Sequence, residues 1–102
     1  AQYRLQSADV RDSATMRAAA EALSAAQGVP DIVIANAGVS IGTLTEAAED
    51  EQAFRDVFEI NVIGMMNTFQ PYVAAMRARG HGVLVGIASV AGYRGLPGSG
   101  AY

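Results

Sequence analysis

Two unbroken apolar runs divide the chain, at residues 32–35 and 83–88. Runs of this kind are typical of strands that are buried on both faces of a parallel sheet, with helices on each side. Near the start, residues 3–8 alternate weakly between apolar and polar positions, which predicts a strand close to a sheet edge. We therefore expect parallel strands near residues 3–8, 31–36 and 83–89.

A helix is expected between the first two strands. Either Asp9 or Asp12 can cap its start. Gly28 is suited to its end, and Pro30 prevents its continuation. Its apolar side chains recur at helical spacing and form one stripe that comprises Met16, Ala19, Ala20, Leu23 and Ala26.

A longer helix is expected from about residue 50 to 79, ending at Gly80. Asn61 places an amide where its apolar stripe needs an apolar side chain, and Pro71 should bend it by removing one hydrogen bond. A capping box could precede the helix, formed by Thr43 and Glu46 with Thr45 as a competing cap.

The resulting order of elements, β-α-β-α-β, predicts an α/β fold with a doubly wound parallel sheet. Ligands of such sheets bind beyond the carboxyl ends of the strands. Polar or glycine-containing segments follow all three expected strands, and they are Asp9-Val10, Asn36-Ala37-Gly38 and Ser89. Asn61 and Tyr102 could face the same rim, which predicts a cleft of hydroxyls, amides and a carboxylate with no metal-ligand set.

Composition excludes several classes of function. The chain has 102 residues, of which 51% are hydrophobic, so it can build one core. Its net charge of −3 argues against binding to nucleic acid or an anionic membrane. It has no cysteine and a single histidine, His81, which argues against thiol chemistry, a Ser-His-Asp triad and a poly-histidine metal site. No membrane-spanning run or leader pattern is visible, and we expect a cytoplasmic protein.

The polar segments resemble the motifs of the short-chain dehydrogenase/reductase family. Asp9-Val10 is similar to the aspartate that the family places beside adenine. Asn36-Ala37-Gly38 matches the end of its Asn-Asn-Ala-Gly motif, with Ala35 in place of the first asparagine. The catalytic tetrad of the family, Asn-Ser-Tyr-Lys, is matched by Asn61, Ser89 and Tyr102, and Tyr102 follows Ser89 by the usual thirteen positions.

The resemblance implies part of a single NAD(P)-binding Rossmann domain over residues 1–102, with strands three to five and their crossover helices. The intact protein would then transfer a hydride between NAD or NADP and a small alcohol or ketone, and the 102-residue chain alone is expected to be inactive. Tyr102 would be the general acid/base, Ser89 would hydrogen-bond the substrate oxygen, and Asn61 would hold a water at a helix irregularity. Asp9, Val10, Asn36, Ala37 and Gly38 would contact the cofactor.

Two parts of the family pattern are not in this sequence. The glycine-rich phosphate loop would precede residue 1, and the tetrad lysine would follow Tyr102 by four positions; the chain contains no lysine at all. A tyrosine ordinarily loses its proton near pH 10, and in the family the lysine and the nicotinamide charge bring this value toward neutrality. The resemblance also implies a homodimer or homotetramer formed through the outer face of the 50–79 helix, with Met66, Val73 and Met76 as apolar contacts.

Each candidate residue also has an ordinary structural interpretation. Tyr102 and Ser89 could be a packing tyrosine and the end of a strand, Asn61 a satisfied buried amide, and Asp9 part of a helix start. Two other functions remain open, namely a non-enzymatic dinucleotide-binding sensor or scaffold, and an inactive truncation. Residues 39–40 and 90–94 are expected to border the substrate pocket, but they do not identify the substrate.

Overall fold

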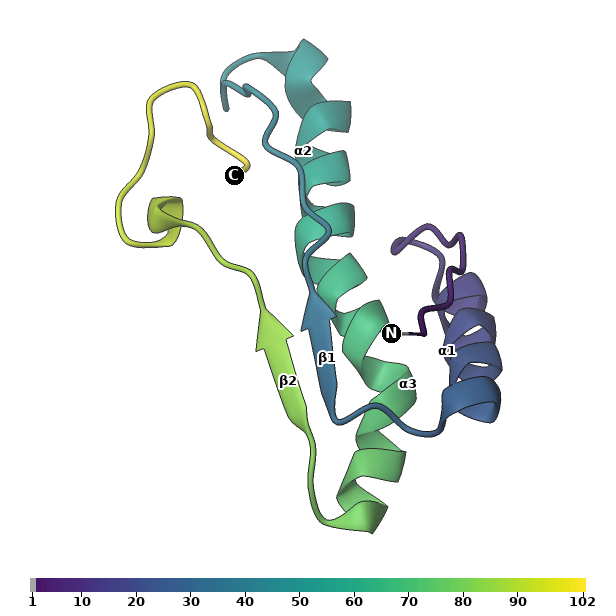
Figure 1. Cartoon of the computed structure of the whole chain (residues 1–102). Coiled ribbons are helices and arrows are strands. Elements are labelled where there is room, and N and C mark those ends of the chain that lie inside the picture. The colour runs from purple at the N-terminus through teal and green to yellow at the C-terminus, as the bar shows by residue number, and fades with distance from the viewer. Residues whose placement is uncertain (1) are drawn as a thin grey trace.

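The computed structural model describes residues 2–102, which form a two-stranded parallel sheet with helices packed on one side (Figure 1). The strands are β1 (Ile32–Ala35) and β2 (Val83–Gly86). The longer helices are α1 (Ser13–Gln27), α2 (Glu51–Phe58) and α3 (Gly64–Arg79). The short helical segments are η1 (Ala48–Asp50), the π-helical η2 (Glu59–Ile63) and η3 (Val90–Gly92).

The two strands pair directly, with Ile32 opposite Val83 and Ala35 opposite Gly86. The predicted parallel α/β arrangement is therefore present, and both strands begin where the apolar runs begin. Helix α3 packs on β1, and α1 packs on α3 (Figure 1).

The expectation that helices cover both faces of the strands is wrong for the part of the chain that the structure describes. Val33 and Ala35 are buried, whereas Ile32 and Ile34 are 56% and 57% exposed. The cause is that no described helix covers the face on which these two isoleucines lie. An apolar run shows that a strand is suited to burial on both faces. Whether both faces are buried depends on the helices that pack against them.

The predicted strand at residues 3–8 is also wrong for this structure, because these residues form no strand. A strand requires a partner for its ladder hydrogen bonds, and here β1 and β2 pair with each other. Residues 3–8 do not pair with β1. A cavity of about 520 Å³ lies between this segment and β1, with Arg4, Leu5 and Gln6 on one side and Ile32 and Ile34 on the other.

The ends of α1 follow the sequence pattern. The carboxylate of Asp12, not Asp9, caps the helix by accepting hydrogen bonds from the Ala14 and Thr15 N–H groups at 3.0 and 3.2 Å. Gly28 ends it with φ +85°, a conformation that suits glycine.

The long helix predicted for residues 50–79 is interrupted within its length. The π turn η2 separates α2 from α3, and its Gly64 N–H donates to the Glu59 carbonyl. Pro71 lies inside α3, which continues to Arg79 and ends at Gly80 in the left-handed region.

Two expectations are wrong, one for the loop that precedes this helix and one for the helix itself. Thr43 and Glu46 form no capping box, because η1 follows Ala47 without a side-chain cap and Thr43 bridges to Ser99 instead. Met76 is not on an outer apolar face but is buried, and a Cβ at Gly82 would lie 2.5 Å from its sulfur. Within the described residues, no helix has both the length and the apolar character to cross a membrane.

Candidate functional site

A cavity of about 510 Å³ lies at the carboxyl ends of β1 and β2. It brings together six of the eight predicted site residues, which are Asn36, Ala37, Gly38, Asn61, Ser89 and Tyr102. Val39 and Ser40 also line it, as expected for residues beside a substrate pocket. The shared rim that strand ends predict is thus present, while the chemical role of each residue remains a prediction.

The lining of this cavity is uncharged and combines polar groups with apolar surface. Its polar side chains in the described chain are amides, hydroxyls and one phenol, and Met65 and Ile87 add apolar surface. No group of three or more histidine, cysteine, aspartate or glutamate side chains in residues 2–102 could hold a metal ion. The cavity therefore suits a neutral ligand group with hydrogen-bonding oxygen atoms.

Asn61 lies in the π turn η2, and its side chain holds the loop after β1. The Val39 N–H donates to Asn61 Oδ1 at 2.8 Å, and Asn61 Nδ2 donates to the Val39 carbonyl at 2.8 Å. A Cβ at Gly38 would lie 3.3 Å from Asn61 Oδ1, so the glycine permits this close approach. The helix irregularity expected at Asn61 is present, and the amide is a satisfied, partly buried group.

Ser89 follows β2 and begins η3. Its Oγ accepts a hydrogen bond from the Ala91 N–H at 3.2 Å, which fixes the side chain as a helix cap. This bond uses an acceptor position of the hydroxyl and leaves its hydrogen free to donate to a ligand.

Tyr102 lies 40% exposed at the same cavity. The segment before it is held against Thr43, whose backbone and hydroxyl bond to Gly98, Gly100 and Ala101. The sequence pattern placed Thr43 in a possible capping box and gave no sign of this contact. Hydrogen bonds between loops leave no periodic pattern in a sequence, so only the glycine content of residues 95–100 hinted at a close approach.

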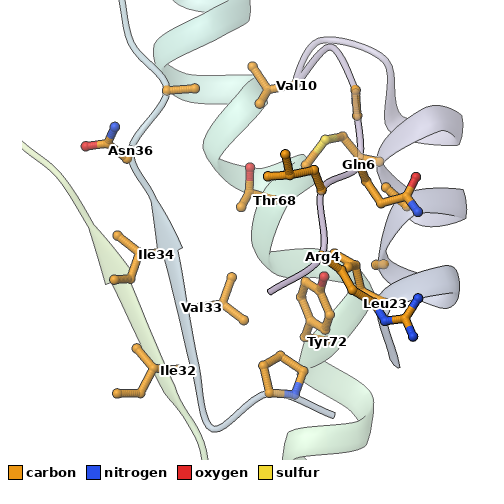
Figure 2. A pocket seen from close by; sticks show the side chains of 17 residues that line it. Arg4, Gln6, Val10, Leu23, Ile32, Val33, Ile34, Asn36, Thr68 and Tyr72 are labelled. Atoms are coloured by element: carbon orange, nitrogen blue, oxygen red, sulfur yellow. The ribbon is translucent and has the colours of Figure 1, made fainter. Parts of the chain in front are cut away.

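Asp9 and Val10 do not line this cavity. Val10 lines the other cavity, beside the N-terminal segment (Figure 2). Asn36 and Ala37 line both cavities. Figure 2 shows Val10 and Thr68 between Asn36 on one side and Gln6 on the other. The end of β1 therefore separates two hollows, one on the Val10 side and one on the Ser89 side.

The Asp9 carboxylate is bound by Arg11 on the surface. Arg11 Nη2 donates to Oδ2 at 2.7 Å, and Nε donates to Oδ1 and Oδ2 at 3.1 and 3.0 Å. With the Arg11 N–H at 2.9 Å, these hydrogen bonds lower the pKa of Asp9 to about 2. The carboxylate stays ionised near neutral pH, but most of its acceptor positions are already used.

Asn67 is a second residue that the sequence analysis missed. Its side chain is buried, and Nδ2 donates to the carbonyls of Val10 and Arg11 at 2.8 and 3.3 Å. A Cβ at Gly64 would lie only 2.6 Å from Val10 Cγ2, so this glycine lets the loop approach α3. The sequence signal that could have identified Asn67 is an amide within the apolar pattern of the helix, the same signal that singled out Asn61.

Comparison with known proteins gives a consistent set of relatives. The sequence model of a family described as "short chain dehydrogenase" matches residues 1–102. The chain is 37% identical over 94 residues to 2-dehydro-3-deoxy-L-rhamnonate dehydrogenase (NAD(+)) of a Sphingomonas species, covering 92% of this chain and 38% of that protein. It is 37% identical over 90 residues to human 17-beta-hydroxysteroid dehydrogenase type 1, covering 87% of this chain and 26% of that protein.

Solved structures agree with the sequence relatives. A gluconate 5-dehydrogenase from Burkholderia cenocepacia, in complex with NADP and tartrate, superposes with a TM-score of 0.83 at 31% identity. That alignment covers 92% of this chain and 39% of the other. The chain thus spans less than half the length of each protein named.

Proposed function

Because this chain belongs to the short-chain dehydrogenase family, we propose that it is part of an NAD(P)-dependent oxidoreductase that acts on a carbonyl or a secondary alcohol. One observation carries the proposal. Asn61, Ser89 and Tyr102 come from three separate segments, and they line one uncharged cavity at the carboxyl ends of β1 and β2.

Tyr102 is the proposed general acid/base, and Ser89 the proposed hydrogen-bond donor to the substrate oxygen. The Ser89 hydroxyl already accepts from Ala91 N–H, so its hydrogen points away from that bond and is available to the substrate. Such a donor stabilises negative charge that develops on the oxygen during reduction, and the phenol supplies the proton. In the oxidation direction, the phenolate takes the proton from the alcohol.

The residues around the end of β1 fit a dinucleotide that extends across it. Asn36 and Ala37 line both hollows, and Gly38 presents backbone without a side chain. We assign Asn36, Ala37 and Gly38 to the nicotinamide half, and Asp9 and Val10 to the adenosine half. When bound, the nicotinamide supplies or accepts the hydride. Either NAD or NADP fits these contacts.

Asn61 has a positioning role and a proposed second role. Its amide fixes the backbone of Val39 beside Gly38, and thereby the cofactor-binding turn. These bonds use one hydrogen and one lone pair of the amide, which leaves one of each to hold the water that passes the proton outward. A lysine that would complete the family's tetrad would come from sequence outside these 102 residues.

The oligomer, the cytoplasmic location and the small-molecule substrate are further proposals. Val62, Met66 and Val73 are exposed on the long helix and would form the contact in a homodimer or homotetramer, without Met76. Light scattering of the whole protein, meaning this chain together with any flanking sequence in its gene, should give more than one protomer. A clean monomer would rule the interface out.

The decisive experiment separates the enzyme from its two alternatives. The whole protein is incubated with NAD or NADP and a panel of ketones and secondary alcohols, and nicotinamide absorbance is followed beside a cofactor-binding titration. We expect both binding and turnover. Binding without turnover favours a sensor or scaffold, and the absence of both favours an inactive truncation. The isolated 102-residue chain should do neither, since it has no phosphate loop and no lysine.

A further inference from the structure

Thr43 is a fully buried residue in a loop rather than in a helix or strand. It is only 2% exposed, although a polar side chain in a loop usually faces water. All three of its polar groups bond to the segment that leads to Tyr102. Its N–H donates to the Gly98 carbonyl at 2.9 Å, its carbonyl accepts the Gly100 N–H at 3.0 Å, and its Oγ1 accepts the Ala101 N–H at 2.9 Å.

The contact is closely fitted as well as hydrogen-bonded. Thr43 and Ser99 form an isolated parallel bridge, so the two segments run side by side. A Cβ at Gly100 would lie 3.0 Å from Thr45 Oγ1 and 3.1 Å from Phe54 Cζ. A larger residue here would require these neighbours to move by a few tenths of an ångström, so glycine suits the close approach to residues 43–45.

The loop that carries Thr43 is itself tied to a helix. The Leu44 N–H donates to Asp50 Oδ2 at 2.7 Å, which links the residue after Thr43 to the segment where α2 begins. The Ala101 backbone is therefore connected to the helical scaffold through Thr43. Tyr102 is the next residue, and its side chain lines the cavity with Ser89 and Asn61.

We propose that Thr43 is a positioning residue that holds Tyr102 at the reaction site through the Ala101 backbone, an inference that rests on the proposed oxidoreductase function. The tyrosine itself lies on a segment outside the sheet and helices, so its hydroxyl depends on this attachment for its place. Proton transfer needs the hydroxyl within hydrogen-bond reach of the reacting oxygen. A displacement of about 1 Å can lower a rate roughly 10²-fold.

The test uses Thr43→Val, which keeps the shape of the side chain and removes the acceptor for Ala101 N–H. In the whole protein we expect kcat to fall by about 10- to 100-fold, with the dinucleotide Kd unchanged. Thr43→Ser retains the hydroxyl and should recover most of the loss. Thr15→Val on α1 is the matched control, because it removes a threonine hydroxyl that donates to Asp12 and lies outside both the cavity and the Thr43 contact.

A double-mutant cycle shows whether the effect passes through the tyrosine. If Thr43 acts by placing the phenol hydroxyl, Thr43→Val should have little further effect in a Tyr102→Phe background. Equal losses in both backgrounds would overturn the proposal, and so would an unchanged kcat in Thr43→Val. A wild type that turns over no substrate would overturn the oxidoreductase proposal and this one together. A wild type that turns over substrate, combined with an unchanged kcat in Thr43→Val, would overturn this proposal alone.

Gly100→Ala covers the case in which Thr43→Val does not fold. The added Cβ would crowd Thr45 Oγ1 and Phe54 Cζ at 3.0 and 3.1 Å, and we expect residues 98–101 to shift while the Thr43 hydroxyl is retained. We expect a similar fall in kcat that again vanishes in the Tyr102→Phe background. A normal kcat in a folded Gly100→Ala protein, shown by the same thermal unfolding midpoint as wild type, would contradict the proposal.

Discussion

Residues 36–45 and 98–102 are held in place, whereas residues 3–8 are not. In residues 36–45 and 98–102, Val39 is hydrogen-bonded to Asn61 and Ala101 to Thr43, at distances of 2.8–2.9 Å. In residues 3–8, Tyr3 and Leu5 are 82% and 84% exposed, and the segment has no strand partner (Figure 1). Both regions lie outside the sheet, so strand membership does not explain the difference.

The comparison teaches that polar partners, rather than apolar content, order the site. Residues 98–102 are rich in glycine and could adopt many conformations as a free chain. Their backbone groups are nevertheless paired with Thr43. Residues 3–8 contain larger apolar side chains but find neither a ladder nor a buried surface.

Tyr102→Phe should have the largest effect. The phenol proton is used only in the reacting state, so kcat should fall by about 10²–10⁴-fold in the whole protein while dinucleotide binding stays nearly intact. Turnover is measured by nicotinamide absorbance and binding by titration. Tyr3→Phe removes the same hydroxyl from the exposed segment and should change neither quantity. Wild-type turnover by Tyr102→Phe on a good substrate would show that the mechanism is wrong.

Ser89→Ala should act in the same direction with a smaller loss. Removing one donor to a developing oxyanion lowers kcat by about 10²–10³-fold. The same variant also removes the cap on Ala91 N–H, so circular dichroism and thermal unfolding must accompany the kinetics. Ser24→Ala on α1 is the matched control. If Ser89→Ala and Ser24→Ala give equal rates, Ser89 does not contact the substrate.

Asn67→Ala tests the buried amide that holds the Val10 loop. It removes the donor to the Val10 and Arg11 carbonyls and leaves space in a buried position. The free energy of unfolding should fall by about 1–3 kcal/mol, as for other buried groups left without a partner. Urea denaturation of the whole protein measures this change. Gln6→Ala, in the exposed segment, should stay within about 0.5 kcal/mol of wild type.

Hydrogen exchange tests why residues 3–8 form no strand. If the cause is a missing partner, a strand from flanking sequence should pair with them in the whole protein. Their amide hydrogens should then exchange as slowly as those of β1, and those of Gly95 and Leu96 should exchange fast. Fast exchange at residues 3–8 in the whole protein would mean that the polar pattern itself, not the missing partner, prevents the strand.

The smallest effect concerns Asp9 and pH. Hydrogen bonds from Arg11 lower its pKa to about 2, below its ordinary value, so the ionised form is favoured in the folded state. The stability it contributes is present above about pH 4 and is lost as the pH falls through 2. Arg11→Gln should raise the Asp9 pKa toward its ordinary range, as followed by NMR of the carboxyl carbon. An unchanged pKa would show that Arg11 is not its cause.

Local features of the sequence determined much of this structure. The two apolar runs predicted β1 and β2, and Asp12, Gly28 and Gly80 predicted helix ends, because capping and strand formation depend on residues close together in the chain. The spacing of Ser89 and Tyr102, together with the strand-end rule, predicted that these residues share one rim with Asn36. Their common cavity follows from the parallel pairing of β1 and β2.

Tertiary structure alone decided the rest. The Thr43–Ala101 and Asn67–Val10 bonds join residues 58 and 57 positions apart, and nothing in either local sequence specifies such a partner. The same reason explains residues 3–8 and the exposed faces of Ile32 and Ile34. A side chain or a strand can be suited to burial by its own chemistry, but whether it is buried depends on which distant part of the chain packs against it.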